Sequence, residues 1–289
     1  MYDLLPEDRI PQIEKIVLPL VEGQEKDFHL PLSLMERLKD NNRNPTRFWW
    51  VSSEEGPSLG LLLVPGHHLL ILGKEPRAAA FAAQAWGLEP RFVPGLVAPE
   101  IAALPFSRIW IERHRLHLIH QMRQGFFEIQ GSPLELERKP EGCLRYARVS
   151  DLPLMNIWLG EFLKETLPHE LERLESLKDE LRFKVNAGIA FLWVVEGQPV
   201  SMACLSKPTL GGLTVNTVYS PRDRRRSGFA SALVHGVSRL ALGRGFRSCS
   251  LYVNLDDQSA THLYERVGYR LRSEVISMAW STLAPNPES

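Results

Sequence analysis

Residues 218–234 are the most informative stretch of the chain and read VYSPRDRRRSGFASALV. An apolar run ends there in a basic turn with one glycine, and the turn leads directly into apolar side chains at helical spacing. The first N–H groups of a helix lack intrahelical partners and lie at the positive end of its dipole. Because Gly228 and Ala230 leave the backbone accessible, the stretch predicts a binding site for a pyrophosphate.

Two motifs in this region resemble those of the GNAT N-acetyltransferase superfamily. Arg225, Gly228 and Ala230 have the spacing of its acetyl-CoA signature, in which Gln or Arg precedes Gly by three residues and a second Gly or Ala by five. Residues 257–269 resemble its second signature, Asn-x-x-Ala-x-x-Leu-Tyr-x-x-x-Gly-Phe/Tyr, with Asp257 at the position of the asparagine. The resemblance covers roughly residues 144–280. Within the superfamily, the chain is similar to a bacterial branch of two-part proteins with a C-terminal acetyltransferase.

The resemblance also implies which residues bind acetyl-CoA. The strand that ends at Ser220 would line the pantetheine arm, and its N–H groups would polarise the thioester carbonyl. Taken alone, the basic run at 222–226 is typical of a solvated turn, but behind a phosphate-type turn it indicates contact with a cofactor phosphate. The predicted cofactor-binding residues are Val218, Tyr219, Ser220, Arg225, Arg226, Ser227, Gly228, Phe229, Ala230, Ser231 and Asp257.

Acyl transfer from a thioester to an amine needs three kinds of group. They are a base or water path for the amine, backbone donors for the oxyanion, and an acid for the thiolate, whose ordinary pKa is about 8.5. Tyr264 resembles the general acid of GNAT enzymes, and a tyrosine at the edge of the core is the alternative interpretation. The base stays open among Glu161, Glu165, His169 and Glu170, each of which is better explained as a solvated helix residue, while Asn216 and Thr217 are candidates for the acceptor site.

A polar, proline-punctuated segment at 131–142 predicts a domain boundary near residue 142. The two predicted domains, 1–142 and 143–289, share no sequence repeat. The resemblance nonetheless implies that the first is a smaller α/β domain and a degenerate GNAT-like half. We assign it no cofactor binding, because it contains no counterpart of the phosphate turn.

The predicted fold class is α/β (α+β). The resemblance gives the C-terminal domain a GNAT fold, with a mixed, mostly antiparallel sheet flanked by helices. Upstream, we expect strands at 48–52, 61–64 and 68–72, a turn at Pro65-Gly66 and a helix at 76–86. Downstream, we expect strands at 144–149, 189–195, 200–205, 213–219, 248–253 and 269–280, and helices at 153–167, at 171–183, after Gly228 and after Asp257.

Composition narrows the class of protein and its setting. The 289 residues contain 34 basic and 34 acidic side chains, so no global charge recruits nucleic acid or an anionic membrane. Three cysteines are too few and too odd in number for a disulfide framework, which favours a reducing compartment, by default the cytoplasm. No apolar stretch reaches the roughly 18 residues that a membrane span needs.

His114, His117 and His120 invite a metal interpretation that their spacing does not favour. On a strand, His117 would face away from the other two, and on a helix the three would spread over a wide arc. Beyond Glu112, no cysteine or nearby aspartate completes a tetrahedral set. We therefore expect no metal.

The sequence as a whole predicts a cytoplasmic N-acetyltransferase that uses acetyl-CoA as cosubstrate and transfers the acetyl group directly to a small-molecule or peptide amine. Two alternatives stay open. One is an enzyme of the same fold that uses a longer acyl-CoA or an amino acid acceptor, and the other is a catalytically silent acetyl-CoA-binding or scaffold protein. A homodimer also stays open.

Overall fold

The computed structural model of the chain describes residues 1–7, 9–39, 47–64, 68–206 and 212–282. The predicted turn at Pro65-Gly66 lies outside these residues. The chain divides into two compact units. Unit 1 comprises Met1–Phe126 and Arg272–Ser289, and unit 2 comprises Phe127–Leu271.

Unit 1 is a sheet covered by helices on both faces. Its elements are β1 (Asp3–Glu7), α1 (Ile10–Val21), α2 (His29–Lys39), β2 (Arg47–Ser53), β3 (Gly56–Leu63), β4 (Leu69–Leu72), α3 (Pro76–Ala85), β5 (Gly95–Ala98), α4 (Glu100–His114), most of β6 (His117–Gln130) and most of β12 (Arg270–Ser281). The strands run β1-β2-β3-β4-β5-β12, and these neighbours are antiparallel except for the parallel pair β4 and β5.

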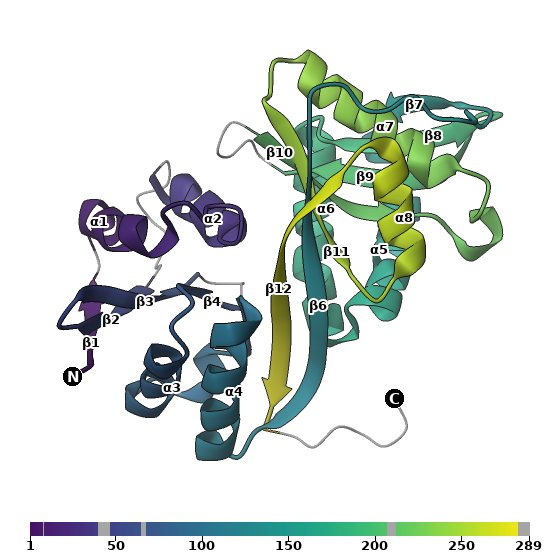
Figure 1. Cartoon of the computed structure of the whole chain (residues 1–289). Helices are drawn as coiled ribbons and strands as arrows, with labels where there is room; N and C mark the ends of the chain where they lie inside the picture. The colour runs from purple at the N-terminus through teal and green to yellow at the C-terminus, as the bar shows by residue number, and fades with distance from the viewer. Residues whose placement is uncertain (8, 40–46, 65–67, 207–211, 283–289) are drawn as a thin grey trace. The chain divides into compact units, whose positions relative to one another are not determined.

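Two apolar layers hold unit 1 together. They lie under the helices that cover the two faces of its sheet (Figure 1). α3 and α4 bury alanines and the rings of Phe106 and Trp110 against one face of the sheet. α1 and α2 bury Val17, Leu34 and their neighbours against the other face. β4 reads Leu-Leu-Ile-Leu and is buried throughout, as expected for a strand between two helical layers.

Unit 2 has the same layered architecture. Its elements are β7 (Cys143–Tyr146), α5 (Leu152–Thr166), the 3-10 turn Pro168–Arg173, α6 (Leu174–Asn186), β8 (Ala190–Val195), β9 (Gln198–Leu205), β10 (Gly212–Tyr219), the 3-10 turn Arg222–Arg224, α7 (Phe229–Gly243), β11 (Ser248–Asn254) and α8 (Gln258–Val267). The strands run β11-β10-β9-β8-β7, and only β10 and β11 are parallel.

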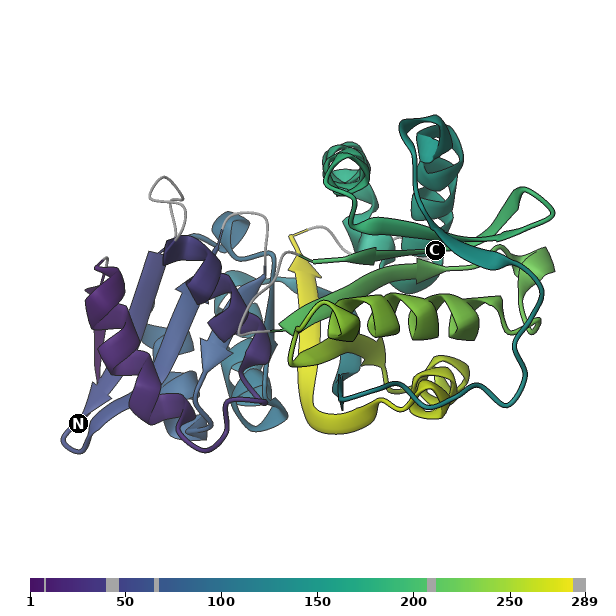
Figure 2. The ribbon, with the colours of Figure 1, turned by 90° about the horizontal axis from the view of Figure 1, so that it is seen from above.

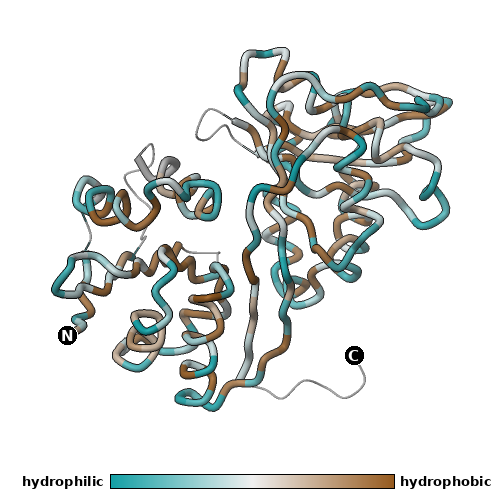
Figure 3. Tube along the Cα trace, viewed as in Figure 1, coloured by the Kyte–Doolittle hydropathy of each residue, from teal (hydrophilic) through white to brown (hydrophobic). Residues whose placement is uncertain are grey.

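The helices of unit 2 cover opposite faces of this sheet, as Figure 2 shows. α7 and α8 pack on one face, where Leu233, Val237 and Val267 are fully buried. α5 and α6 pack on the other face through Met155, Leu181 and their neighbours. Figure 3 shows apolar residues in helices and strands alike and polar residues in many of the connecting turns. The predicted fold class, a mixed and mostly antiparallel sheet flanked by helices, is confirmed.

The two halves of the chain, β1 to β6 and β7 to β12, repeat one order of elements, strand-helix-helix-strand-strand-strand-helix-strand-helix-strand, although the sequence shows no repeat. Strand directions repeat as well, since the fourth and fifth strands of each repeat form its parallel pair. The N-terminal half therefore has the same topology as the C-terminal half. Its first two helices, α1 and α2, and its helix α4 have no counterpart among the elements that the sequence predicts.

The last strand of each repeat extends into the other unit. β12 follows α8 in the chain, but from Arg272 onward it belongs to unit 1, where Ile276–Ala279 pair with Gly95–Ala98. Conversely, β6 ends in unit 2, where Phe127 and Ile129 are buried in the core. Each unit is thus completed by residues from the other repeat.

The predicted linker at 131–142 forms no helix or strand but packs on unit 2. The Leu134 N–H donates to the Val267 carbonyl over 3.0 Å, and Trp193 Nε1 donates to the Glu141 carbonyl over 2.8 Å. The linker thus belongs to unit 2, and the compact units divide the chain after Phe126 and after Leu271. The predicted domain limits, 1–142 and 143–289, stay a prediction.

Among the described residues, none of the helices combines the length and the apolar character needed to cross a bilayer.

Candidate active site

The turn between β10 and α7 contains two residues in the left-handed region. Arg226 has φ 62°, which is uncommon for a residue other than glycine, and Gly228 has φ 81°. A Cβ atom at Gly228 would meet only the Pro140 ring, at 3.8 Å, an ordinary contact. Glycine is therefore favoured at 228 by the backbone angle and not by a lack of space.

α7 begins with backbone donors that have no partner in the described part of the chain. Gly228 is its N-cap, and no side chain of the described chain caps it. The first intrahelical bond runs from the Ala232 N–H to the Gly228 carbonyl over 3.0 Å. The N–H groups of Phe229, Ala230 and Ser231 are thus left for another acceptor, at the positive end of the helix dipole. This arrangement can bind an anion.

The equivalent helix of unit 1, α3, begins differently. Its N-cap Glu75 has φ −81°, and the Glu75 carboxylate accepts a hydrogen bond from the Arg77 N–H over 3.0 Å. Pro76 at the first position has no N–H to offer. A carboxylate therefore already occupies the place that an anionic ligand would take.

β10 contains a β-bulge just before the turn. Asn216 pairs with Cys204 and Tyr219 with Met202, so Thr217 and Val218 lie opposite the single residue Ala203. Thr217 has φ 52°, a rare value for a β-branched residue. The parallel ladder to β11 covers Gly212–Thr214, and within the described part of the chain it goes no further along β10. The backbone N–H groups of Thr217 and Val218 therefore lie outside the regular ladders to β9 and β11.

Tyr264 lies on α8 in the same apolar cluster as Val218 and Phe229. Its side chain is only 8% exposed and packs edge-to-face on Tyr269, with ring centroids 6.1 Å apart. Among the described residues its hydroxyl has no hydrogen-bond partner. Burial, reinforced by the charge of Asp257, raises the pKa of the Tyr264 hydroxyl, so this group keeps its proton at neutral pH.

Two arginines of the turn are bound to α5. Arg222 Nε donates to Glu165 Oε1 over 2.9 Å, and Arg225 Nη2 donates to Glu165 Oε2 over 2.6 Å. The Arg225 guanidinium also lies over the Tyr219 ring, 5.5 Å from its centroid. Partial burial alone would raise the pKa of Glu165, but the hydrogen bonds from the two arginines hold it below its usual value.

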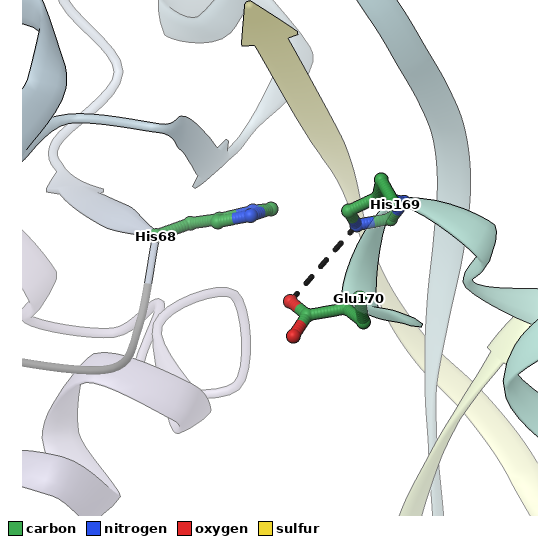
Figure 4. A group of neighbouring side chains, drawn as sticks. All are labelled: His68, His169 and Glu170. Atoms are coloured by element: carbon green, nitrogen blue, oxygen red, sulfur yellow. Dashed lines mark ion pairs between the residues drawn. The ribbon is translucent and has the colours of Figure 1, made fainter. Parts of the chain in front are cut away.

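Glu161, one helical turn before Glu165, accepts a hydrogen bond from the Tyr219 hydroxyl over 2.8 Å. Burial, together with this bond to a carboxylate, raises the pKa of Tyr219 to about 12. His169 and Glu170 lie on the following 3-10 turn, where His169 Nε2 is 4.0 Å from Glu170 Oε1 (Figure 4). Glu170 also pairs with Arg173 at 2.6 Å. Glu161, Glu165 and Glu170 are therefore each held by a neighbouring donor.

The remaining predicted residues have mainly local partners. Ser220 Oγ donates to Ser201 Oγ over 2.9 Å, and Ser201 Oγ donates to the Tyr219 carbonyl over 3.0 Å. Asp257 caps α8, because its Oδ1 accepts the Ala260 N–H over 3.0 Å. Ser227 is exposed, and its hydroxyl lies 3.5 Å from the Arg225 carbonyl.

Lys184 of α6 contacts a candidate site residue, Asn216, and the sequence did not reveal this contact. Its Nζ donates to Asn216 Oδ1 over 3.2 Å, and Thr217 Oγ1 donates to the same oxygen over 3.2 Å. α6 is rich in charged residues, so no local pattern distinguishes this lysine from its neighbours. Only the packing of α6 on the sheet brings it to β10.

The three histidines of 114–120 do not form a ligand set in the described chain. His114 ends α4 and packs on the Trp110 ring, 4.2 Å between centroids, while burial and the nearby Arg113 lower its pKa. His117 and His120 lie on β6, where a separation of three residues puts them on opposite faces.

Comparison with known proteins identifies the family of this region. Residues 152–269 match the family described as Acetyltransferase (GNAT) family. No curated protein matches the chain. Among solved structures, the chain is similar to a GCN5-related N-acetyltransferase from Sphaerobacter thermophilus, with a TM-score of 0.63 and 19% identity over 96% of this chain and 95% of that one.

Two further structures also cover nearly the whole chain. A Drosophila protein has a TM-score of 0.65 and 13% identity over 96% of this chain and 98% of that one. A tandem GNAT protein from the clavulanic acid biosynthesis pathway has a TM-score of 0.53 and 12% identity over 99% and 100%. These identities speak for the fold alone, and the tandem protein agrees with the repeated order of elements. The predicted family and enzyme class are confirmed: the chain carries an acetyltransferase domain of the GNAT family in residues 152–269.

Proposed function

We propose that this chain is an acetyl-CoA-dependent N-acetyltransferase whose cofactor site is built by the end of β10, the basic turn and the start of α7. The observation that carries the proposal is the open N-terminus of α7 behind Gly228, with donors at residues 229–231 and no capping side chain in the described chain. A pyrophosphate fits this arrangement, because several N–H groups and the helix dipole act on one anion. Glu75 opposes the same use of α3.

Among the arginines of the turn, we assign the phosphate contact to Arg226 before Arg225. Arg225 is bound to Glu165, and its guanidinium covers the Tyr219 ring. Arg226 is exposed and has no partner among the described residues, so a phosphate would not have to displace a carboxylate from it. Phe229, Ala230 and Ser231 would contribute their backbone N–H groups.

When bound, the cosubstrate supplies an acyl group activated as a thioester. The bulge in β10 would direct backbone N–H groups at 217–219 to the carbonyl oxygen, where negative charge develops during transfer. Tyr264 would hold a proton at Oη and donate it to the departing thiolate sulfur as the C–S bond breaks. The amine would attack the thioester carbonyl directly, so that a C–N bond forms as the C–S bond breaks, and the amine would lose its proton to a base or through a water path, without a covalent intermediate on the enzyme.

The acceptor would be a small-molecule or peptide amine. Cys143, Cys204 and Cys249 are all unpaired, which supports the proposed cytoplasmic setting.

Titration calorimetry with acetyl-CoA tests the site. Gly228→Val should lower the affinity at least about tenfold, which corresponds to roughly 1.4 kcal/mol. Gly245→Val is the matched control, because Gly245 follows the other end of α7 with φ 91° and nothing within 4 Å. It introduces a comparable backbone strain away from the proposed site. Equal affinity in both folded variants would contradict the assignment.

Release of free thiol in the presence of an amine panel tests the reaction. Turnover with acetyl-CoA supports the proposal. Preferred turnover of longer acyl-CoA, or of amino acids within the panel, would support the enzyme of different specificity. Saturable binding without turnover of any amine would identify a silent binder.

A further inference from the structure

The bulge in β10 holds a strained residue without an obvious local cause. Thr217 has φ 52°, and β-branched residues disfavour this region because Cβ and its substituents crowd the backbone. Such conformations persist when the surrounding structure fixes them, and they concentrate at functional sites. Contacts with neighbouring residues must therefore hold Thr217 in this conformation.

On the upstream side of the bulge, two hydrogen bonds converge on the side-chain oxygen of Asn216. Asn216 Oδ1 accepts hydrogen bonds from Lys184 Nζ and from Thr217 Oγ1, each over 3.2 Å. Asn216 is also the last β10 residue paired with β9 before the register shifts, opposite Cys204. The bond from Lys184 thus acts on the residue next to the strained one, and Thr217 is tied to the same atom.

Lys184 differs from the other cations of α6. Lys178 pairs with Glu175 and Arg182 pairs with Asp179, three residues earlier on the same helix in both cases. Lys184 is half-buried and has no carboxylate partner among the described residues. The nearby Cys204 supplies no countercharge, because burial raises the pKa of its thiol to about 11. The bond to Asn216 is therefore a charge-assisted bond to a neutral acceptor.

The downstream side of the bulge is fixed by neutral groups. Ser201 Oγ donates to the Tyr219 carbonyl over 3.0 Å, and Ser220 Oγ donates to Ser201 Oγ over 2.9 Å. Ser201 is completely buried, which protects this contact from water. With Tyr219 fixed on one side and Asn216 on the other, only a narrow range of backbone conformations remains for Thr217 and Val218.

We propose that Lys184 is a positioning residue that holds the β10 bulge, through Asn216, in the conformation that presents backbone N–H groups to the acyl oxygen. This inference rests on the proposed function. Lys184 touches neither the acyl group nor the amine in this scheme. Its contribution is to stabilise the strained backbone before the substrate arrives, so that little reorganisation is needed in the transition state.

The test compares Lys184→Met with Lys178→Met in the full chain. Met keeps most of the lysine stem and removes the charge, and Lys178 is a matched control on the same helix. In Lys184→Met, amide hydrogen exchange in peptides covering 213–219 should accelerate about tenfold or more, as expected for loss of a charge-assisted bond. The value of kcat should fall by a similar factor, with little change in the KM for acetyl-CoA. Lys178→Met should change neither quantity.

A second variant separates positioning from general destabilisation. Asn216→Ala removes the acceptor, so adding Lys184→Met to it should cause no further change in exchange or in kcat. Lys184→Arg should restore part of the loss, because it keeps a charged donor. Unchanged exchange in Lys184→Met, or full additivity with Asn216→Ala, would overturn the proposal. If the parent turns over no amine, the proposed function fails, and the exchange measurement still decides whether Lys184 holds the bulge.

Discussion

Arg225 Nη2 donates to Glu165 Oε2 over 2.6 Å, which ties the basic turn to α5. Arg222 donates to the second oxygen of the same carboxylate over 2.9 Å. The neighbouring Arg226 has no partner in the described part of the chain. The three arginines therefore differ in their contacts: Arg222 and Arg225 fix the turn, and Arg226 is available to a ligand.

Replacing Arg226 should affect the cofactor, and replacing Arg225 should affect mainly the turn. Arg226→Met should weaken CoA binding by roughly 1.5–3 kcal/mol, the range for hydrogen bonds to charged groups, with little effect on a pantetheine that lacks the phosphates. Arg225→Met should have the smaller effect on CoA. Calorimetry with both ligands measures the difference. An equal loss for CoA and pantetheine in Arg226→Met would argue against a phosphate contact.

Glu165 should give the protein a stability increment that depends on pH. Its folded-state pKa lies below the unfolded value of about 4.3, so the increment is present above about pH 5 and is lost as pH falls through the folded-state pKa. Because the pair with Arg225 is partly exposed, Glu165→Gln should cost less than about 1 kcal/mol at pH 7. Urea unfolding of parent and variant at several pH values measures the difference.

The control for this pH effect removes the cations instead. In a background with Arg222→Ala and Arg225→Ala, Glu165→Gln should have almost no effect at any pH. A difference that persists in this background, or that grows as the pH falls below 4, would contradict the assignment of the increment to these ion pairs.

Tyr264→Phe should lower turnover and leave stability nearly unchanged. The hydroxyl has no hydrogen-bond partner among the described residues, so its removal leaves no buried group unpaired. A general acid contributes typically about 10²–10⁴-fold, and kcat should fall within or just below this range while acetyl-CoA affinity stays nearly constant. Thiol release and calorimetry measure the two quantities.

Tyr269→Phe is the matched control for Tyr264→Phe. Its hydroxyl lies 2.7 Å from Ser238 Oγ in the same core, so this variant should lose about 1 kcal/mol of stability and keep its turnover. If Tyr264→Phe were as active as the parent, Tyr264 would have no role as the acid.

Two fragments should behave differently, because β6 ends in unit 2 and most of β12 belongs to unit 1. Residues 127–271 keep Phe127 and Ile129 in their core, and this fragment should be soluble and bind acetyl-CoA. Residues 141–289 lose both side chains and carry Ile276, Met278 and Trp280, which are buried in unit 1 of the full chain. The second fragment should aggregate, since its apolar strand has no sheet to join. Light scattering and calorimetry compare them, and a monodisperse, binding-competent 141–289 fragment would contradict this expectation.

Much of unit 2 could be predicted because its signals are local. Apolar periodicity predicted a strand at 248–253 and a helix at 153–167, and the structure has β11 at Ser248–Asn254 and α5 at Leu152–Thr166. The start of α7 was also predicted, since Gly228 allows a positive φ at the end of a polar turn. The charge-rich helix predicted at 171–183 begins later, at Leu174, because residues 168–173 form a 3-10 turn.

The sequence by itself determined the order of elements in unit 2, the family that residues 152–269 match and the glycine-bearing turn before α7, because these depend on residues close together in the chain. Tertiary structure alone decided which side chains meet. It joined Glu165 to Arg225 and Lys184 to Asn216, across 60 and 32 residues of chain. It also placed β12 beside β5 in the sheet of unit 1. Such contacts arise from packing of distant segments, and local periodicity carries no information about which segments will pack together.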